Sequence, residues 1–162
     1  MVKVLFVCTG NICRSPTAHG LLRAHAADAG LADQIQVDSA GTHSYHAGQP
    51  PDPRSTATAR MHGIDLSDLR ARPVSRNDFA DFDIISVMEH RHEQVLRKLC
   101  PAGLTERIGL LMRFAPQAPS LEIPDPYYGD DGFEMVFRMI ESGVLGLLDH
   151  IRHSHPVGKI RN

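Results

Sequence analysis

The sequence predicts an α/β fold: a single-domain, three-layer sandwich with a central parallel sheet of about four strands and helices on both faces. Short β-branched and apolar runs alternate along the chain with segments of helical periodicity, which is the pattern of right-handed βαβ units. The length of 162 residues corresponds to one domain, and no repeat, low-complexity segment or linker divides it. We therefore expect residues 1–162 to form one domain.

Four short stretches have the composition of strands and are bounded by turn residues. We expect strands at Val2–Val7, Gln34–Ser39, Asp83–Met88 and Arg107–Met112. The first of these is apolar at almost every position, which is typical of a strand buried on both faces of a parallel sheet.

Helical patterns occupy the intervals between these strands. We expect helices from Ser15 to Gly30, from about Pro53 to His62, through Val95–Leu99 up to Pro101, and from Phe133 to Ile151. Ser15 and Asp52 are the expected N-caps of the first two, and Ser75 could cap a short turn. Two long loops remain, at 40–53 and 115–131, and the polar tail from about residue 153 is expected to be frayed.

Composition and charge exclude several classes of function. The chain has 17 Lys and Arg against 19 Asp and Glu, a net charge of −2, which gives no general attraction to nucleic acid or an anionic membrane. The run Val4–Val7 is far shorter than the roughly 20 residues of a membrane span, and no secretory cleavage site follows it. The 3 cysteines do not form a disulfide framework. We expect a soluble, cytoplasmic monomer without nucleic-acid or membrane partners.

The turn between the first strand and the first helix carries the residues of an anion site. Ligands of parallel sheets bind beyond the carboxyl ends of the strands, and there the chain reads Cys8-Thr9-Gly10-Asn11-Ile12-Cys13-Arg14-Ser15. Backbone N–H groups and the positive end of a helix suit phosphate at such a turn. Gly10 and Asn11 tolerate left-handed backbone angles, and Arg14 offers a planar fork to two oxygens.

Cys8 ends the strand and is the candidate nucleophile. A free thiol is only slightly ionised at neutral pH, but the positive cradle and Arg14 favour the thiolate, and Ser15 can donate a hydrogen bond to the sulfur. A Cys and an Arg at this spacing occur by chance in roughly one such chain in four, so the alternative is an inert, buried cysteine. The strand–turn–helix context favours the phosphate cradle.

The second long loop supplies a candidate general acid. Transfer of phosphate from an oxygen ester to sulfur leaves an alkoxide or phenoxide that needs a proton. Asp125 lies between two prolines, which reduce the cost of holding a carboxylate in place, and Tyr127 and Tyr128 can wall a slot for a flat aromatic group. The alternative is a solvated acidic turn before the last helix.

Taken together, these residues resemble the low-molecular-weight protein tyrosine phosphatases. The segment Val7–Pro16 is similar to the phosphate loop of that family, and Asp125–Gly129 is similar to its acid loop. The segments Val37–Thr42 and Asp78–Asp83 lie between them in the order of the family. The resemblance covers about residues 2–152.

The resemblance implies hydrolysis of phosphotyrosine in proteins and of small aryl phosphates, with no metal or cofactor and with phosphate or other oxyanions bound at the loop. Cys8 would attack phosphorus to form a cysteinyl-phosphate, Arg14 would bind the oxygens, and Asp125 would protonate the leaving group and then activate water. The implied substrate-binding residues are Thr9, Gly10, Asn11, Ile12, Cys13, Ser15, Tyr45, Tyr127 and Tyr128.

The resemblance also implies roles in support of the loop. Asn11 would hold its strained shape with Ser39 as a hydrogen-bond partner, and Cys13 would trap oxidised Cys8 as a reversible disulfide. Two positions depart from the family pattern. Many members carry a His in the segment aligned with Asp68–Arg70, where this chain has none, and many have Asp where this chain has Glu89.

Three alternatives remain open. A non-catalytic phosphotyrosine-binding module would keep the cradle without the nucleophile or acid. An arsenate reductase relative would need two further cysteines late in the chain, where only Cys100 is found. A metal protein is suggested by His90-x-His92 and by His150, His153 and His155, but no Cys/His spacing here is a zinc signature.

Overall fold

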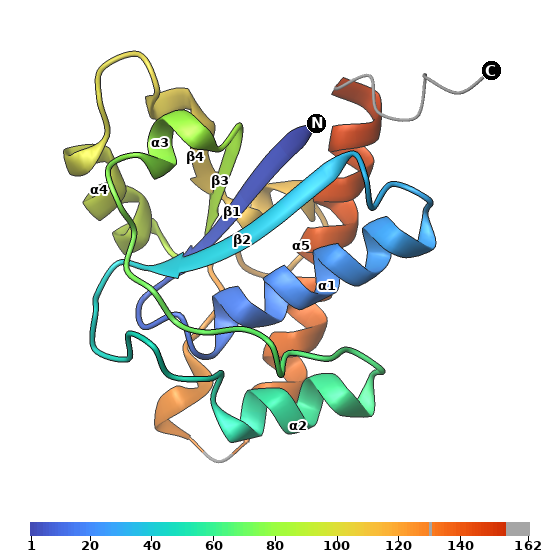
Figure 1. Ribbon diagram of the computed structural model, residues 1–162. Helices are drawn as coiled ribbons and strands as arrows, with labels where there is room; N and C mark the ends of the chain where they lie inside the picture. The colour runs from blue at the N-terminus through green and yellow to red at the C-terminus, as the bar shows by residue number, and fades with distance from the viewer. Residues whose placement is uncertain (130, 155–162) are drawn as a thin grey trace.

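The sheet has four parallel strands, as predicted, in the order β2-β1-β3-β4. The computed structural model describes residues 1–129 and 131–154 (Figure 1). The strands are β1 (Val2–Cys8), β2 (Ile35–Gly41), β3 (Ile84–Val87) and β4 (Ile108–Leu110). β1 pairs with both β2 and β3, so the first strand of the chain lies in the interior of the sheet.

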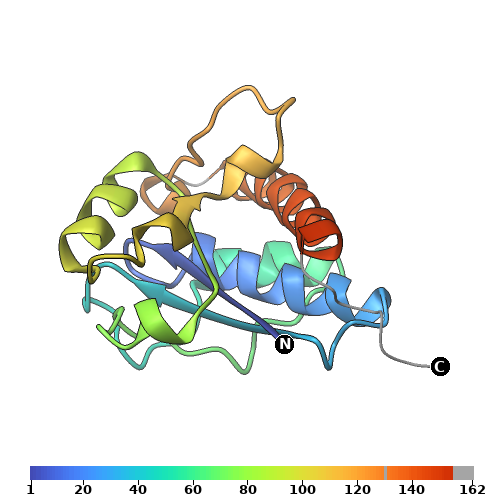
Figure 2. The same ribbon diagram turned by 90° about the horizontal axis from the view of Figure 1, so that it is seen from above.

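Helices cover both faces of this sheet, which confirms the predicted α/β layers. They are α1 (Arg14–Asp28), α2 (Pro53–Met61), α3 (Asp78–Asp81), α4 (His90–Leu99) and α5 (Phe133–Ser154). Short 3₁₀ turns are η1 (Thr105–Arg107), η2 (Leu111–Phe114) and η3 (Pro126–Tyr128). Figure 2 shows α1 and α5 on one side of the sheet and α4 on the other.

Successive residues of β1 face two different hydrophobic cores. Val4, Phe6 and Cys8 pack with side chains of α1 and α5, whereas Leu5 and Val7 pack with side chains of α3 and α4. Side chains of a strand alternate between the faces of a sheet. Because both faces of β1 are covered, its residues are apolar without interruption from Val4 to Cys8. The strand places Cys8 at the carboxyl edge of the sheet.

The first helix begins two residues earlier than the predicted N-cap, Ser15, would place it. Cys13 occupies the N-cap position of α1 without a side-chain cap, and Ser15 lies inside the helix. The prediction of Ser15 as N-cap is therefore wrong, because its hydroxyl turns toward Cys8. Asp52 does cap α2, as predicted, by accepting a hydrogen bond from the Arg54 amide at 2.8 Å.

Between residue 75 and the end of α5, the structure differs from the prediction at three places. The fourth strand is shorter than predicted, because 3₁₀ turns replace it at both ends. The short helix α3 was not predicted; near it, the Ser75 amide donates to the Asp78 carboxylate at 2.8 Å. α5 continues through His153 and Ser154, which were expected in a frayed tail; the remainder of that tail, 155–162, lies outside the described residues.

Within residues 1–129 and 131–154, no helix has both the length and the apolar character that a bilayer crossing requires.

Candidate active site

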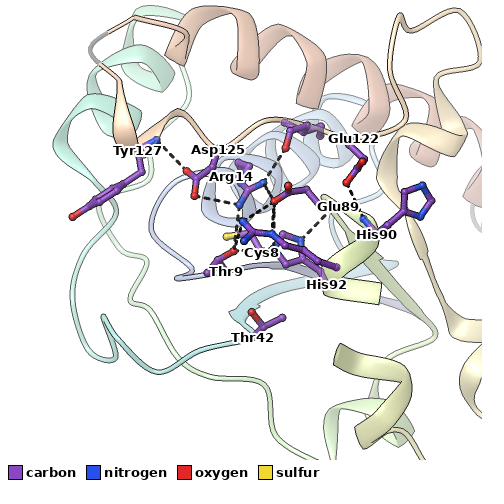
Figure 3. A network of polar contacts seen from close by, with 12 residues as sticks. Cys8, Thr9, Arg14, Thr42, Glu89, His90, His92, Glu122, Asp125 and Tyr127 are labelled. Carbon is purple, nitrogen blue, oxygen red and sulfur yellow. Dashed lines mark hydrogen bonds and ion pairs between the residues drawn. The ribbon is translucent and has the colours of Figure 1, made fainter. Parts of the chain in front are cut away.

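The turn from β1 to α1 forms a pocket at the carboxyl edge of the sheet, where Asp125 reaches over it from the second long loop (Figure 3). The pocket is lined by Cys8, Thr9, Gly10, Ile12, Cys13, Arg14, Tyr45, His46, Asp125, Tyr127 and Tyr128. The three residues predicted to be catalytic thus lie on one cavity. Every predicted substrate-binding residue is also there except Asn11 and Ser15, which are buried behind its wall.

The Cys8 thiol has a hydroxyl partner. Cys8 Sγ lies 3.0 Å from Ser15 Oγ, and Asn11 Nδ2 donates to that same Oγ at 2.7 Å. Since the Ser15 oxygen accepts from Asn11, its own proton is available to the sulfur, which is nearer than the alternative acceptor, the Ala40 carbonyl at 3.4 Å. The Ser15 hydroxyl is therefore placed to donate a hydrogen bond to the Cys8 sulfur.

Several backbone amides of the loop after Cys8 have no hydrogen-bond acceptor among the described residues. Among the described residues, the backbone N–H groups of Gly10, Asn11, Ile12 and Cys13 donate no hydrogen bond to a protein acceptor. Buried amides are nearly always paired, so four unpaired amides in one curled loop at a helix N-terminus form a cradle for an oxyanion.

Asn11 determines the curl of this loop. With φ of 58°, it is the one non-glycine residue of the described chain in the left-handed region. The side-chain amide of Asn11 stabilises that shape through both of its polar atoms. Nδ2 donates to the Ser15 hydroxyl, and Oδ1 accepts from the backbone N–H of Arg72 at 3.0 Å.

The end of β2 passes directly behind the cradle. A Cβ atom on Gly41 would lie 2.7 Å from the Thr9 carbonyl oxygen and 3.2 Å from the Asn11 nitrogen. Both are backbone atoms that cannot move aside cheaply. Glycine at this position is therefore a requirement of the loop geometry.

Arg14 lies in the first turn of α1 with its side chain 1% exposed. Nη1 donates to Glu89 at 2.6 Å and to the Ile123 carbonyl at 2.9 Å, while Nη2 lies 3.5 Å from the Asp125 carboxylate. Figure 3 shows the guanidinium between Glu89 and Asp125. The planar group is thus fixed on one side by Glu89 and presents its other nitrogen toward the cradle.

Glu89 and His92 follow β3 and complete the network around Arg14. Burial opposes ionisation of Glu89, but hydrogen bonds and charge from Arg14 and Arg91 outweigh it and hold its pKa below the ordinary value. Burial, assisted by the positive Arg14, lowers the pKa of His92 to about 3. The neutral ring accepts from the Glu89 amide at Nδ1 and donates from Nε2 to the Thr9 hydroxyl at 2.9 Å.

Neither Glu89 nor His92 was predicted as a site residue. In the sequence, Glu89 stands out only as a departure from the family pattern and His92 only as part of a metal-ligand spacing. The signal available in the sequence was their position, since both follow the third strand and so belong to the same sheet edge as Cys8.

Asp125 is the N-cap of η3. Its Oδ1 accepts from the Tyr127 amide at 3.0 Å, while Oδ2 faces Arg14. The carboxylate is therefore oriented by its own turn, with one oxygen directed at the cradle, which is the arrangement needed to reach an ester oxygen bound there.

Aromatic side chains form the rim of the pocket. Tyr45 is 72% exposed and stacks on His43 with ring centroids 4.8 Å apart; Tyr127 and Tyr128 meet edge to face at 5.1 Å. His46, which was not predicted, also lines the pocket, with its ring 6.1 Å from that of Tyr127. A flat aromatic group fits between such walls.

The two loop cysteines have different environments. Burial raises the pKa of the Cys13 thiol to about 12, so this residue stays neutral, and its side chain packs in a small apolar cluster with Ile12, Ala71 and Phe133. Cys8, beside the Ser15 hydroxyl, is the cysteine in a position to act as a nucleophile.

Ser39 does not contact Asn11 as expected. Its hydroxyl lies 3.0 Å from Nδ1 of the buried His19 on α1, and Asn11 is bonded instead to Ser15 and to the Arg72 amide. The prediction of an Asn11–Ser39 bond is therefore wrong. Ser39 connects β2 to α1 below the loop, and the segment at Arg72 takes the place expected for Ser39.

The model of the family described as low molecular weight phosphotyrosine protein phosphatase matches residues 3–157. The chain belongs to this family. The phosphatase is 42% identical over 157 residues to the low molecular weight protein-tyrosine-phosphatase of Streptomyces coelicolor, with 93% of each chain covered. It is 39% identical over 152 residues to YfkJ of Bacillus subtilis, which covers 94% of this chain and 97% of that protein.

Solved structures agree with the sequence relatives. The crystal structure of YfkJ from Bacillus subtilis aligns with a TM-score of 0.92 at 38% identity, covering 96% of this phosphatase and 97% of that chain. A protein tyrosine phosphatase from Entamoeba histolytica, with Hepes in the active site, aligns with a TM-score of 0.91 at 35% identity, covering 95% and 99%. The predicted family and fold are thus confirmed.

Within the described part of the phosphatase, no three His, Cys, Asp or Glu side chains are grouped so as to hold a metal ion. His90 and His92 lie at the start of α4 and His150 and His153 on α5, while His155 lies outside the described residues.

Proposed function

We propose that this phosphatase hydrolyses phosphotyrosine esters through a cysteinyl-phosphate intermediate, with Cys8 as nucleophile, Arg14 as oxyanion ligand and Asp125 as general acid. In this proposal residues 1–162 act as one phosphatase domain. The observation that carries it is the convergence of a hydroxyl-bonded thiol, a cradle of unpaired amides and a capped carboxylate on one pocket.

In the first step, the phosphoryl oxygens bind the loop amides and Arg14. The Cys8 sulfur attacks phosphorus while the bond from phosphorus to the phenolic oxygen breaks. Asp125, protonated at this stage, gives its proton to that oxygen, so that tyrosine leaves as a neutral phenol. Arg14 and the amides are in place before the reaction, so charge that develops on the phosphoryl oxygens is stabilised without reorganisation.

In the second step, Asp125 is ionised and accepts a proton from water. The water oxygen attacks phosphorus, the bond from phosphorus to sulfur breaks, and the thiolate leaves with inorganic phosphate as product. The Ser15 hydroxyl, 3.0 Å from the sulfur, stabilises the thiolate both at rest and as the leaving group.

The rim accounts for selectivity toward tyrosine. The thiol is buried, and a phosphoryl group must reach it past Tyr45 and Tyr127, which line the pocket. A phosphotyrosine side chain is long and flat enough to do so, and its ring packs against aromatic walls. A phosphoserine is too short for the same approach.

The test is hydrolysis of phenyl phosphate and a phosphotyrosine peptide by the wild type, Cys8→Ser, Asp125→Asn and the control Cys100→Ser, with a chelator present. Cys8→Ser should abolish turnover, Asp125→Asn should lower it by about 10²- to 10⁴-fold, and Cys100→Ser should retain it. Acid-quenched wild type should carry phosphate on the peptide that contains Cys8. Unchanged turnover in Cys8→Ser would overturn the mechanism, and tight phosphotyrosine binding without turnover in the wild type would indicate a binding module.

A further inference from the structure

Arg54 lies in the first turn of α2, next to the loop that carries Asp125. We propose that Arg54 is the positioning residue of this acid loop: it holds Asp125 over the cradle, so that its loss weakens proton donation to the leaving group and leaves phosphate binding intact. This inference rests on the proposed role of Asp125 as general acid.

Three contacts join Arg54 to the residues that follow Asp125. Nη1 donates to the Gly129 carbonyl at 2.9 Å, and Nη2 donates to the Tyr127 carbonyl at 3.0 Å. The guanidinium carbon also lies 5.6 Å from the centroid of the Tyr127 ring. A planar fork that bonds two carbonyls of one short turn fixes the position and tilt of that turn.

The Arg54 guanidinium is also bonded on its other side, to Asp52. Asp52, only 7% exposed, accepts from Arg54 Nε at 3.1 Å and from Nη2 at 3.0 Å. Burial opposes ionisation of Asp52, but the hydrogen bonds and charge of Arg54 outweigh it and keep the pKa of that carboxyl below its ordinary value. The ring of Phe133 lies 4.7 Å from the guanidinium carbon, which adds a cation–π contact.

Asp52 is also bonded to the phosphate loop. Its backbone N–H donates to the Ile12 carbonyl at 2.8 Å. One residue therefore anchors both the cradle and the arginine that reaches the acid loop. The direct contact between the phosphate loop and the acid loop is longer than these bonds, since the Arg14 guanidinium and the Asp125 carboxylate are 3.5 Å apart. The first turn of α2 thus sets the distance between the general acid and the bound phosphate.

This distance matters for one step of the reaction. A proton donor must lie within hydrogen-bond reach of the ester oxygen, and a displacement of about 1 Å can cost up to 10²-fold in rate. Phosphate binding depends on the loop amides and Arg14, whereas the bonds of Arg54 described above lead to Asp52 and to the acid loop. The loss of rate on substitution of Arg54 should therefore be largest for leaving groups that must be protonated as they depart.

The test is kcat/KM for a series of aryl phosphates whose phenols differ in acidity, because kcat/KM reports the step in which the phenol leaves. Arg54→Met should lower kcat/KM by about 10- to 100-fold for esters of weakly acidic phenols such as tyrosine, and by less than about threefold for nitrophenyl esters, whose anions leave without a proton. Arg54→Lys, which can reach one carbonyl but not two, should lie between Arg54→Met and the wild type.

A matched control is Arg23→Met. Arg23 also forms a paired bond to a carboxylate, Asp68, at 2.8 and 2.9 Å, and reaches a backbone carbonyl, that of Asp65, at 3.2 Å, so its bonds lead to residues 65–68 and not to the acid loop. This variant should show the leaving-group dependence of the wild type. Competitive inhibition by inorganic phosphate should be the same in all these variants.

A double variant separates positioning from general damage. Arg54→Met should cause no further loss in an Asp125→Asn background, because the group that it positions is already absent. Equal losses across the ester series, additive losses in the double variant, or weaker inhibition by phosphate would overturn the positioning role. If Asp125→Asn itself shows no leaving-group dependence, the proposed function fails instead; a normal Asp125→Asn effect with wild-type behaviour of Arg54→Met overturns only this inference.

Discussion

Two buried histidines, His19 and His92, are expected to make the phosphatase sensitive to acid. His19 on α1 is 8% exposed and lies 3.0 Å from the Ser39 hydroxyl. Burial, reinforced by the positive charge of Arg23, lowers the pKa of His19 from 6.5 to about 4. For His92, burial and Arg14 lower the pKa to about 3. Each ring is therefore neutral in the folded protein at pH values where the unfolded chain binds a proton.

The sign and size of the effect follow from this difference. Below pH 6.5 and above the folded pKa, the unfolded state carries one more proton per histidine, so the free energy of unfolding decreases as pH falls. The slope is about 1.4 kcal/mol per pH unit for each ring. For His19 the window between 6.5 and about 4 corresponds to a loss of roughly 3 kcal/mol, with the full stability present above pH 6.5.

Urea unfolding at several pH values between 4.5 and 7.5 measures this slope in the wild type, His19→Gln and His92→Gln. Each substitution should reduce the slope in the acid half of that range by about 1.4 kcal/mol per pH unit, and the double variant should reduce it by about twice as much. Any loss of stability that is constant with pH leaves this comparison intact. If His19→Gln keeps the wild-type slope, the ring is not buried in its neutral form and the reasoning is wrong.

Three further substitutions test individual contacts. Glu89→Gln removes the charge that Arg14 meets at 2.6 Å and should lower the free energy of unfolding by about 2 kcal/mol in urea titrations; an unchanged midpoint would contradict this. Gly41→Ala places a methyl group 2.7 Å from the Thr9 oxygen and should weaken competitive inhibition by phosphate at least about tenfold; equal inhibition would show that the loop yields freely. The Ser86 hydroxyl is buried without a hydrogen-bond partner among the described residues, so Ser86→Ala should maintain or raise the urea midpoint, and a fall would refute the cost assigned to that hydroxyl.

The parts of the site that could be predicted are those in which chemistry and local geometry coincide. Cys8 and Arg14 belong to one strand–turn–helix junction. Asp125 lies between two prolines, in a loop without helical or strand periodicity. The apolar runs and helical stripes likewise predicted four strands and four of the helices, because each depends on burial of one continuous segment.

The parts that could not be predicted depend on contacts between distant segments. Serine is a common helix cap, so the sequence predicts that role for Ser15. In the structure its hydroxyl instead contacts the Cys8 sulfur, because Cys8 lies at the adjacent strand end. In the sequence, nothing distinguishes Arg54 from a surface arginine. Its role depends on the bond to the Tyr127 carbonyl, 73 residues away in the chain. Glu89 meets Arg14 across 75 residues of chain, a pairing that no local pattern encodes.

The contacts of Arg14 also have a consequence for the order in which the protein becomes active. Its guanidinium is held by the Ile123 carbonyl, 109 residues later in the chain, and by Glu89, which follows β3. During synthesis residues 8–15 emerge before Glu89 and Ile123, so a nascent chain carries this loop before the residues that hold Arg14 have been added. Contacts of such long range form late and slowly in folding. Turnover of an aryl phosphate therefore reports the completed chain, and a truncation before Ile123 would carry residues 8–15 without the Ile123 carbonyl that helps to orient Arg14.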